Sequence, residues 1–369
     1  MSDPSGTARA PLAFHPYYEQ HAADEAEAIH ALQNVFATMA TKVAETEGRA
    51  QRAVHAKGHA LLRGSLTVLP GLPAHLVQGL FATPGDYEVL LRWSSPPAEQ
   101  LPDTVSTPRA VAIKILDVPG ERFDTAKAGH SQDFLMVNGP AFSRPDPQGF
   151  LADVKLLAAT TERAPGAKAA LSSLMRGAEA VIEAVGGESG KIKAMGGEPQ
   201  HHPLGETYYS QTPFLYGEYM AKLSLAPVSS ALTALDGAAL DNDADAQRAA
   251  IAAFFSGEKG DGAEWELRVQ LCVDVEAMPI EDASVPWPEE LSPYVAVARL
   301  TLPRQQSWDP AESPRLEDET AFDPWNCLAA HRPLGAVNRA RREVMAVSRD
   351  LRSEFNRCPI HEPAATRQP

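Results

Sequence analysis

The hydrophobic pattern predicts helices in several parts of the chain. Residues 29–43 carry apolar side chains three or four positions apart, which places them on one face of an amphipathic helix. These side chains are Ile29, Leu32, Phe36, Met39 and Val43. Residues 148–196 also read as helical and end near paired glycines, and the acidic run 241–247 reads as a helix start. A last helix is expected near 337–351, with Val337, Ala340, Val344, Val347 and Leu351 on its buried side.

Other segments alternate apolar and polar residues, which is typical of β-strands. In the first half of the chain they are 62–68, 87–93 and 111–115, and Pro-Gly pairs separate them. Similar segments return at 219–228, 265–275 and 294–302. Short strands joined by tight turns favour an antiparallel sheet or barrel over alternating strand–helix units.

The expected fold class is therefore α+β, an antiparallel β-barrel with peripheral and C-terminal helices. Residues 1–50 form an N-terminal arm and helix, 51–302 the barrel with helical insertions, and 303–369 a wrapping segment, the C-terminal helix and a tail. These parts are expected to make one structural domain. From Pro359 on, the chain reads as a loose tail.

Composition and charge narrow the possible partners. With 369 residues and 44% apolar content, the chain can bury a large core. The formal net charge of −15 argues against a nucleic acid partner. No apolar stretch approaches the roughly 18 residues of a membrane span, so no membrane partner is expected. The opening residues do not read as a secretory leader and the three cysteines are far apart, so we expect a cytoplasmic protein.

Four short motifs between residues 52 and 142 carry the candidate chemistry. They are RAVHAKG at 52–58, LRWS at 91–94, DTVSTPRAVAIK at 103–114 and DFLMVNGPAF at 133–142. Each has an ordinary explanation when taken alone: a structural histidine, a strand serine, a turn asparagine and solvated arginines. Their combined order and spacing favours a shared site.

This order and spacing resembles the haem-pocket motifs of the catalase family. The third motif departs from the family's usual form, with Ser106 and Ala110 in place of an Arg and a Gly. Segments 207–228, 278–303 and 322–344 look like the small catalase-related peroxidases, and the flavodoxin-like domain of large catalases is not found in this sequence. The resemblance implies a catalase-like barrel, haem b as cofactor and a possible homo-oligomer.

The resemblance also assigns three catalytic roles. His55 matches the distal histidine, whose neutral imidazole takes a proton from peroxide and returns it to the departing oxygen. Ser94 matches the serine that orients this histidine by holding its other ring nitrogen. Asn138 matches the asparagine whose amide donates a hydrogen bond to the peroxide.

Further matches concern the cofactor itself. Arg52 and Arg92 match arginines that hold the haem propionates, because guanidinium groups pair with carboxylates. Phe142 falls in the aromatic segment that lines the porphyrin. These residues complete the expected distal wall and the propionate end of the pocket.

The proximal position departs from the family. Where the family has an Arg-x-x-x-Tyr pair that supplies a tyrosinate to iron, this chain has Arg341 followed by Met345. The last tyrosine, Tyr294, lies well before this helix. Met345 could bind iron through its thioether, His331 or Cys327 could replace it, iron could lack a protein ligand on this side, or haem could be absent. Taken alone, Met345 is an ordinary core filler.

Two other candidate groups have ordinary interpretations. His201 and His202 are adjacent and lack a third ligand at metal-site spacing, so they are expected to lie in a loop. Cys272 falls in an alternating segment and is expected in the core.

The favoured function is a haem-dependent catalase- or peroxidase-like oxidoreductase acting on hydrogen peroxide or an organic hydroperoxide, with a small reductant as second partner. Weak catalase turnover is expected because the proximal tyrosine is missing. One alternative is a fatty-acid hydroperoxide lyase or isomerase, which would rearrange its substrate. Another is a non-catalytic protein of the same fold, with or without haem.

Overall fold

A computed structural model describes residues 9–96, 98–105, 107–124, 129–160, 199–257, 261–363 and 365. Two expectations fall outside these residues: the helical prediction beyond residue 160, and the local geometry at Ser106.

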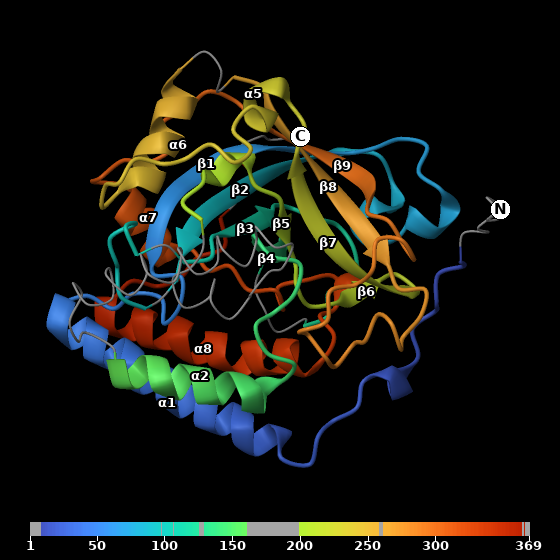
Figure 1. Ribbon diagram of the computed structural model, residues 1–369, viewed down its shortest axis with the longest axis horizontal. Helices are drawn as coiled ribbons and strands as arrows, with labels where there is room; N and C mark the ends of the chain where they lie inside the picture. Colours follow the sequence, from blue (N-terminus) through green and yellow to red (C-terminus); the bar gives the residue numbers. More distant parts are fainter. Residues whose placement is uncertain are drawn as a thin grey trace, which may run out of the picture.

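The strands form one antiparallel sheet that closes on itself (Figure 1). Their order is β5-β4-β3-β2-β1-β9-β8-β7-β6, and β5 also pairs with β7, which closes an eight-stranded barrel with β6 attached to β7. The strands are β1 Lys57–Val68, β2 Asp86–Ser95, β3 Ala110–Ile115, β4 Gln132–Val137, β5 Tyr208–Tyr209, β6 Phe214–Tyr216, β7 Tyr219–Pro227, β8 Ala263–Leu271 and β9 Val295–Leu302. The predicted antiparallel barrel is confirmed.

Side-chain alternation explains why this sheet closes around a core. In β2, for example, Val89, Leu91 and Trp93 point to one face, and all three are at most 1% exposed. They belong to the large apolar cluster of the barrel, which contains residues of β1, β3, β4, β7, β8 and β9 as well. The period-two pattern of the sequence is therefore the inner wall of the barrel.

Three long helices cover one side of the barrel: α1 (Glu25–Glu47), α2 (Pro147–Thr160) and α8 (Ala336–Asn356). They lie side by side beneath the sheet in Figure 1. Leu32 and Phe36 of α1 and Val344 of α8 share a second apolar cluster, which holds the helical layer together. The amphipathic pattern thus predicted α1 and α8, and only the structure shows that these two helices pack on each other.

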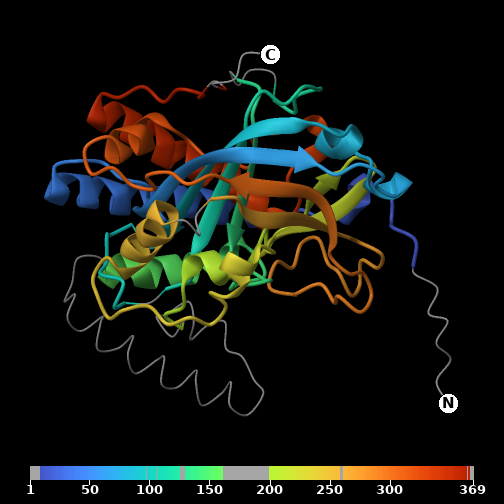
Figure 2. The same ribbon diagram turned by 90° about the horizontal axis from the view of Figure 1, so that it is seen from above.

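Shorter helices complete the chain (Figure 2). They are α5 Ser230–Thr233, α6 Ala246–Ser256 and α7 Ser313–Glu319, with 3-10 turns at Pro16–Tyr18, Ala74–Leu76, Gly79–Ala82, Pro203–Gly205 and Ala329–His331. Helix α6 begins directly after Asp245, which confirms the acidic run as a helix start. No helix within the described ranges is long and apolar enough to span a bilayer.

The C-terminal tail differs from its prediction. Glu362 binds the buried Lys114 at 3.0 Å and accepts a hydrogen bond from Ser131 at 2.7 Å. The amide of His361 donates a hydrogen bond to the carbonyl of Glu319 at 2.8 Å. The tail was expected to be loose, because sequence alone does not reveal that Lys114 needs a second carboxylate. The segment around Glu362 is instead fixed to the barrel.

Candidate functional site

The four sequence motifs meet at one edge of the barrel. Gly58 of β1 pairs with Ser94 of β2, Ser94 pairs with Ala110 of β3, and Ala110 pairs with Val137 of β4. His55 lies three residues before the first of these positions, and Asn138 lies one residue after the last. Strand pairing therefore brings together segments that are far apart in the sequence.

The outer face of this wall is buried as well as its inner face. Arg92 and Ser94 alternate with the core residues of β2, so they point away from the barrel interior, yet each is only 3% exposed. The segment before β1, helix α7 and helix α8 cover them. A site between the barrel wall and α8 is thus enclosed on two sides.

His55 is held in an uncommon conformation at this edge. Its φ of 53° lies in the left-handed region, which few residues other than glycine adopt and which is frequent at functional sites. Its Nδ1 is buried and has no hydrogen-bond partner. Burial, together with the positive charges of Arg92 and Arg341, lowers the pKa of His55 to about 3. The imidazole is therefore neutral at physiological pH and can accept a proton.

The expected pairing of Ser94 with His55 is not formed. The serine–histidine contact in this region joins Ser95 Oγ to His59 Nε2 at 2.9 Å, one residue further along β2. Ser94 shares the outer face of β2 with Arg92, and its backbone pairs with Gly58 rather than with the His55 segment. The orienting role of Ser94 stays a prediction.

Asn138 is tied to its own end of the wall. Its Oδ1 accepts a hydrogen bond from the backbone N–H of Arg109 at 2.8 Å. Its Nδ2 donates to Oε2 of Glu206 at 3.3 Å, and Glu206 also binds the Arg109 guanidinium. These contacts fix the orientation of the carboxamide, and one of its two N–H groups is committed to Glu206.

Arg52 and Arg92 converge, as the resemblance implied, but on a carboxylate of the chain itself. Glu317 of α7 is hydrogen-bonded by Nε of Arg92, and its Oε2 lies 3.8 Å from Nη1 of Arg52. Arg52 and Arg352 also donate to the backbone carbonyls of Glu317 and Thr320 at 2.9–3.2 Å. We call Arg52, Arg92 and Arg352 the arginine cluster.

The arginine cluster keeps Glu317 ionised. Burial alone would raise the pKa of this carboxyl, but the charges of Arg92 and Arg52 outweigh burial and lower it. Arg352 was missed in the sequence analysis. The one feature of the sequence that could have indicated Arg352 is its spacing. Arg352 lies eleven positions after Arg341 and thus on nearly the same face of the last helix.

Helix α8 presents a polar stripe to the wall. Ser348 accepts a hydrogen bond from the backbone N–H of Ala53 at 3.0 Å, and Arg352 joins the arginine cluster one turn later. Arg341, two turns before Ser348, is close enough to His55 to lower its pKa. Met345 is half-buried and lies between Arg341 and Ser348 on this stripe. The predicted proximal position therefore faces the wall segment that carries His55.

Phe142 connects the wall to the helical layer. Its ring lies 5.0 Å from the ring of Phe150 of α2, measured between centroids, and 5.7 Å from the guanidinium carbon of Arg341. Phe142 thus lies beside the expected pocket and contacts the arginine that precedes Met345.

Two residues weighed as replacement iron ligands, His331 and Cys327, lie outside α8. Nε2 of His331 accepts the backbone N–H of Leu80 at 2.9 Å, and Nδ1 lies 3.3 Å from the Leu215 carbonyl, so both ring nitrogens are committed inside the barrel. Cys327 is 1% exposed, and its carbonyl binds the Phe123 amide. Neither side chain lies on the α8 stripe.

The remaining sequence candidates are structural. His201 forms an isolated bridge with Ala239, and His202 caps the turn Pro203–Gly205, as expected for a loop. In the part of the chain that the structure describes, no three metal-binding side chains cluster. Cys272 is fully buried, directly after β8, which confirms its place in the core.

Comparison with known proteins supports the fold and not the sequence relationship. No family model and no curated protein sequence matches this chain. Its structure is similar to a fungal catalase (TM-score 0.57, 18% identity, 86% of this chain and 63% of that one). It is also similar to catalase A from Saccharomyces cerevisiae (0.57, 16%, 86% and 65%) and to a bacterial catalase (0.58, 17%, 98% and 66%).

The chain spans less than two thirds of the length of these catalases. At identities of 16–18% the likeness shows the fold alone. The closed antiparallel barrel with its layer of helices therefore identifies this chain as a protein with the catalase fold.

Proposed function

We propose that this protein is a haem-dependent oxidoreductase acting on hydrogen peroxide or an organic hydroperoxide, with weak catalase turnover. The observation that carries the proposal is the neutral imidazole of His55, with its Nδ1 buried, opposite the Arg341–Met345 face of α8. A small reductant is the second substrate.

The chemistry of the residues fits haem at two places. The arginine cluster contains three guanidinium groups and one carboxylate, so its charge suits a further carboxylate such as a propionate. His55 offers an unpartnered Nδ1 and a neutral ring at the edge of the wall. Arg52, Arg92 and Arg352 would hold the propionates, with Phe142 against the macrocycle.

The packing requires movement before haem can enter. Glu317 already takes the position between the arginines, and Ala53 touches Ser348 of α8 directly. A flat macrocycle between His55 and Met345 needs these contacts to be released. Met345 supplies a neutral thioether where an anionic ligand would favour O–O cleavage, which is why we propose weak catalase turnover.

Haem would supply redox chemistry at iron, and the chain's own residues would handle the proton. His55 would accept the proton of the hydroperoxide and return it to the oxygen that leaves, because its ring is neutral at pH 7. Asn138, fixed by Arg109 and Glu206, would orient the peroxide from the other end of the wall. Burial, together with the charges of Arg92 and Arg341, keeps the pKa of His55 low, so the ring would release the proton again.

The test is a haem titration of the full chain, followed by peroxide-dependent oxidation of a small donor. We expect a Soret band that saturates at one haem per chain. His55→Asn should lower turnover by about 10²-fold, the usual scale of a general acid/base. Asparagine tolerates the left-handed backbone of this position, so the fold should be kept. The matched control is His75→Ala, because His75 is exposed.

A second candidate is a haem-free protein that keeps the catalase fold without catalysis. The direct contacts of Glu317 and Ser348 across the expected pocket favour it. Absence of any Soret shift on haem addition would establish this second candidate over the first. A lipid hydroperoxide that is rearranged without donor oxidation would instead indicate a lyase or isomerase.

A further inference from the structure

Arg341 is a half-buried cation, and its hydrogen bonds among the described residues reach no carboxylate. Its guanidinium makes two hydrogen bonds, both from Nη1: to Oγ1 of Thr212 at 3.0 Å and to Oδ1 of Asn338 at 3.3 Å. Both acceptors are neutral. Burial lowers the pKa of Arg341 to about 10, so the group is still charged at pH 7. A charge that is partly removed from water without an ion partner carries a desolvation cost, and a nearby anion would offset that cost.

The neutral acceptors are fixed in place. Nδ2 of Asn338 donates to the carbonyls of Pro213 and Leu334 at 2.9 and 2.8 Å, which leaves its Oδ1 directed at Arg341 and Thr212. The Asn338 amide therefore cannot turn. The two groups that the guanidinium binds, Thr212 and Asn338, are oriented dipoles without negative charge.

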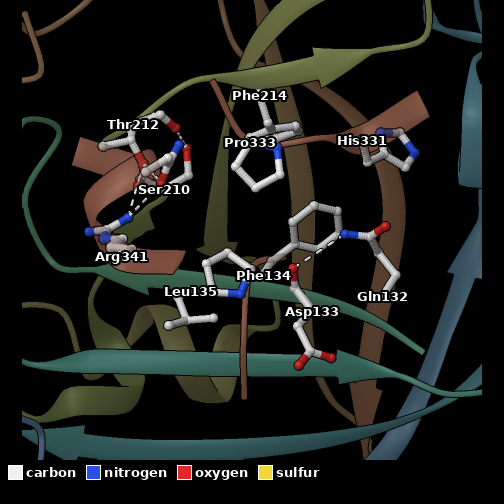
Figure 3. A pocket seen from close by; sticks show the side chains of 12 residues that line it. Gln132, Asp133, Phe134, Leu135, Ser210, Thr212, Phe214, His331, Pro333 and Arg341 are labelled. Atoms are coloured by element: carbon white, nitrogen blue, oxygen red, sulfur yellow. Dashed lines mark hydrogen bonds between the residues drawn. The ribbon is translucent and has the colours of Figure 1, made fainter. Parts of the chain in front are cut away.

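A cavity of about 20 Å³ adjoins this guanidinium (Figure 3). Arg341, Thr212, Ser210 and Asn338 line its polar end, and Phe134 and Phe214 are among its apolar walls. Its size suits a single water-sized particle. Asp133 also lines the cavity, but both its carboxylate oxygens bind Lys114 at 2.9 Å, and Figure 3 shows this carboxylate turned away from Arg341.

We propose that this cavity is a binding site for a small monovalent anion of the size of chloride, held by Arg341 at the N-terminal part of α8. The charge and the free donors come from the guanidinium, because the hydroxyl protons of Thr212 and Ser210 are already donated to Oδ1 of Asn338 and to the Thr212 carbonyl. The small volume excludes larger oxyanions. This inference concerns the protein without added cofactor and does not depend on haem binding.

The experiment measures thermal unfolding of the full chain at constant ionic strength while chloride replaces methanesulfonate. We expect a saturable rise of the melting temperature by about 1–2 °C, as for a ligand that stabilises the folded state of a chain of this length by about 1 kcal/mol. Arg341→Gln should remove this rise, whereas Arg342→Gln should keep it, because Arg342 is exposed and pairs with Asp124.

Two further measurements keep the proposal open to refutation if Arg341→Gln does not fold. Met345→Glu places a carboxylate one helical turn from Arg341 and should abolish the chloride effect by supplying the anion internally. Crystals grown in bromide should show an anomalous peak between Arg341 and Thr212. A melting temperature that does not respond to chloride, an equal response in Met345→Glu, or a cavity without bromide would each overturn the proposal.

Discussion

At the scale of single residues, Met345 marks the strongest departure from the catalase-family pattern. It follows Arg341 by one turn on the stripe that faces His55, so Met345→Tyr would place a phenol where the family has its iron ligand. The positive charge of Arg341 should favour ionisation of that phenol. With haem present, we expect a changed visible spectrum and higher peroxide turnover than in the unsubstituted protein.

The matched control for this substitution is Met345→Phe, which has similar bulk and no hydroxyl. If both variants give the same spectrum, position 345 does not reach the iron. If only the phenol changes it, the proximal assignment holds.

Glu317 is the second residue for which a substitution should have a distinct effect, here on haem affinity. It neutralises part of the arginine cluster, and a bound propionate would have to compete with it. Glu317→Gln should therefore tighten haem binding by about tenfold or more, the scale of a charge-assisted hydrogen bond of roughly 1.5–3 kcal/mol. The same change should lower the free energy of unfolding of the haem-free protein, because the arginines lose their anion.

Asp318→Asn is the control for Glu317, since Asp318 is the next residue of α7 and pairs with Arg49 at 2.7 Å. Equal haem affinity in Glu317→Gln and the unsubstituted protein would show that Glu317 and haem do not compete. The same titration measures whether the unsubstituted protein binds haem at all, so haem binding and its competition with Glu317 are tested separately.

At the scale of elements, the start of α8 determines where the whole polar stripe lies. Gly335 precedes this helix with a φ of +83°, and a side chain there would meet the carbonyl oxygen of Ile280. Gly335→Ala should therefore destabilise the protein by about 1–3 kcal/mol, because it adds both backbone strain and a steric clash. Chemical denaturation monitored by circular dichroism measures this loss.

Gly48→Ala separates the two contributions. Gly48 has a φ of +70° at the end of α1, but nothing lies within 4 Å of the position of an added Cβ. Gly48→Ala should therefore lower the free energy of unfolding only by the cost of a left-handed backbone at a residue with a Cβ. A loss in Gly335→Ala no larger than that in Gly48→Ala would contradict the close packing of α8 on the Ile280 carbonyl.

At the scale of the whole molecule, buried ionisable groups set the response of stability to pH. Burial lowers the pKa of His331 to about 4, while the unfolded chain has a histidine pKa near 6.5. Unfolding therefore takes up a proton between these values, so this group's contribution is full above pH 6.5 and is lost as pH falls toward 4. His55 acts in the same direction. Asp133 acts oppositely, because burial raises its pKa to about 7.

His331→Gln removes the contribution of His331 to the pH dependence of stability. The difference in unfolding free energy between the unsubstituted protein and this variant should fall by about 1.4 kcal/mol for each pH unit of acidification between pH 6 and 4.5. Urea denaturation at several pH values measures it, with the exposed His30→Gln as control. A difference that does not vary with pH would contradict a neutral buried His331.

Sequence periodicity determined the barrel and its covering helices, because burial on one face requires period two in a strand and period 3.6 in a helix. Val89, Leu91 and Trp93, or Leu32 and Phe36, could be assigned to the core for that reason. The sequence also determined the identity of the residues at the wall, including His55 and the absence of a tyrosine at position 345.

Only the tertiary structure decided which charges meet. Glu317 and Arg92 are 225 positions apart, and nothing local in either segment indicates their contact. The same holds for Glu362 with Lys114. It also holds for Arg341, because the neutral acceptors that meet it among the described residues depend on the segments that pack around it. Ion pairs act over a few ångströms between side chains that the barrel and helices bring together, so their partners follow from the packing of the whole chain.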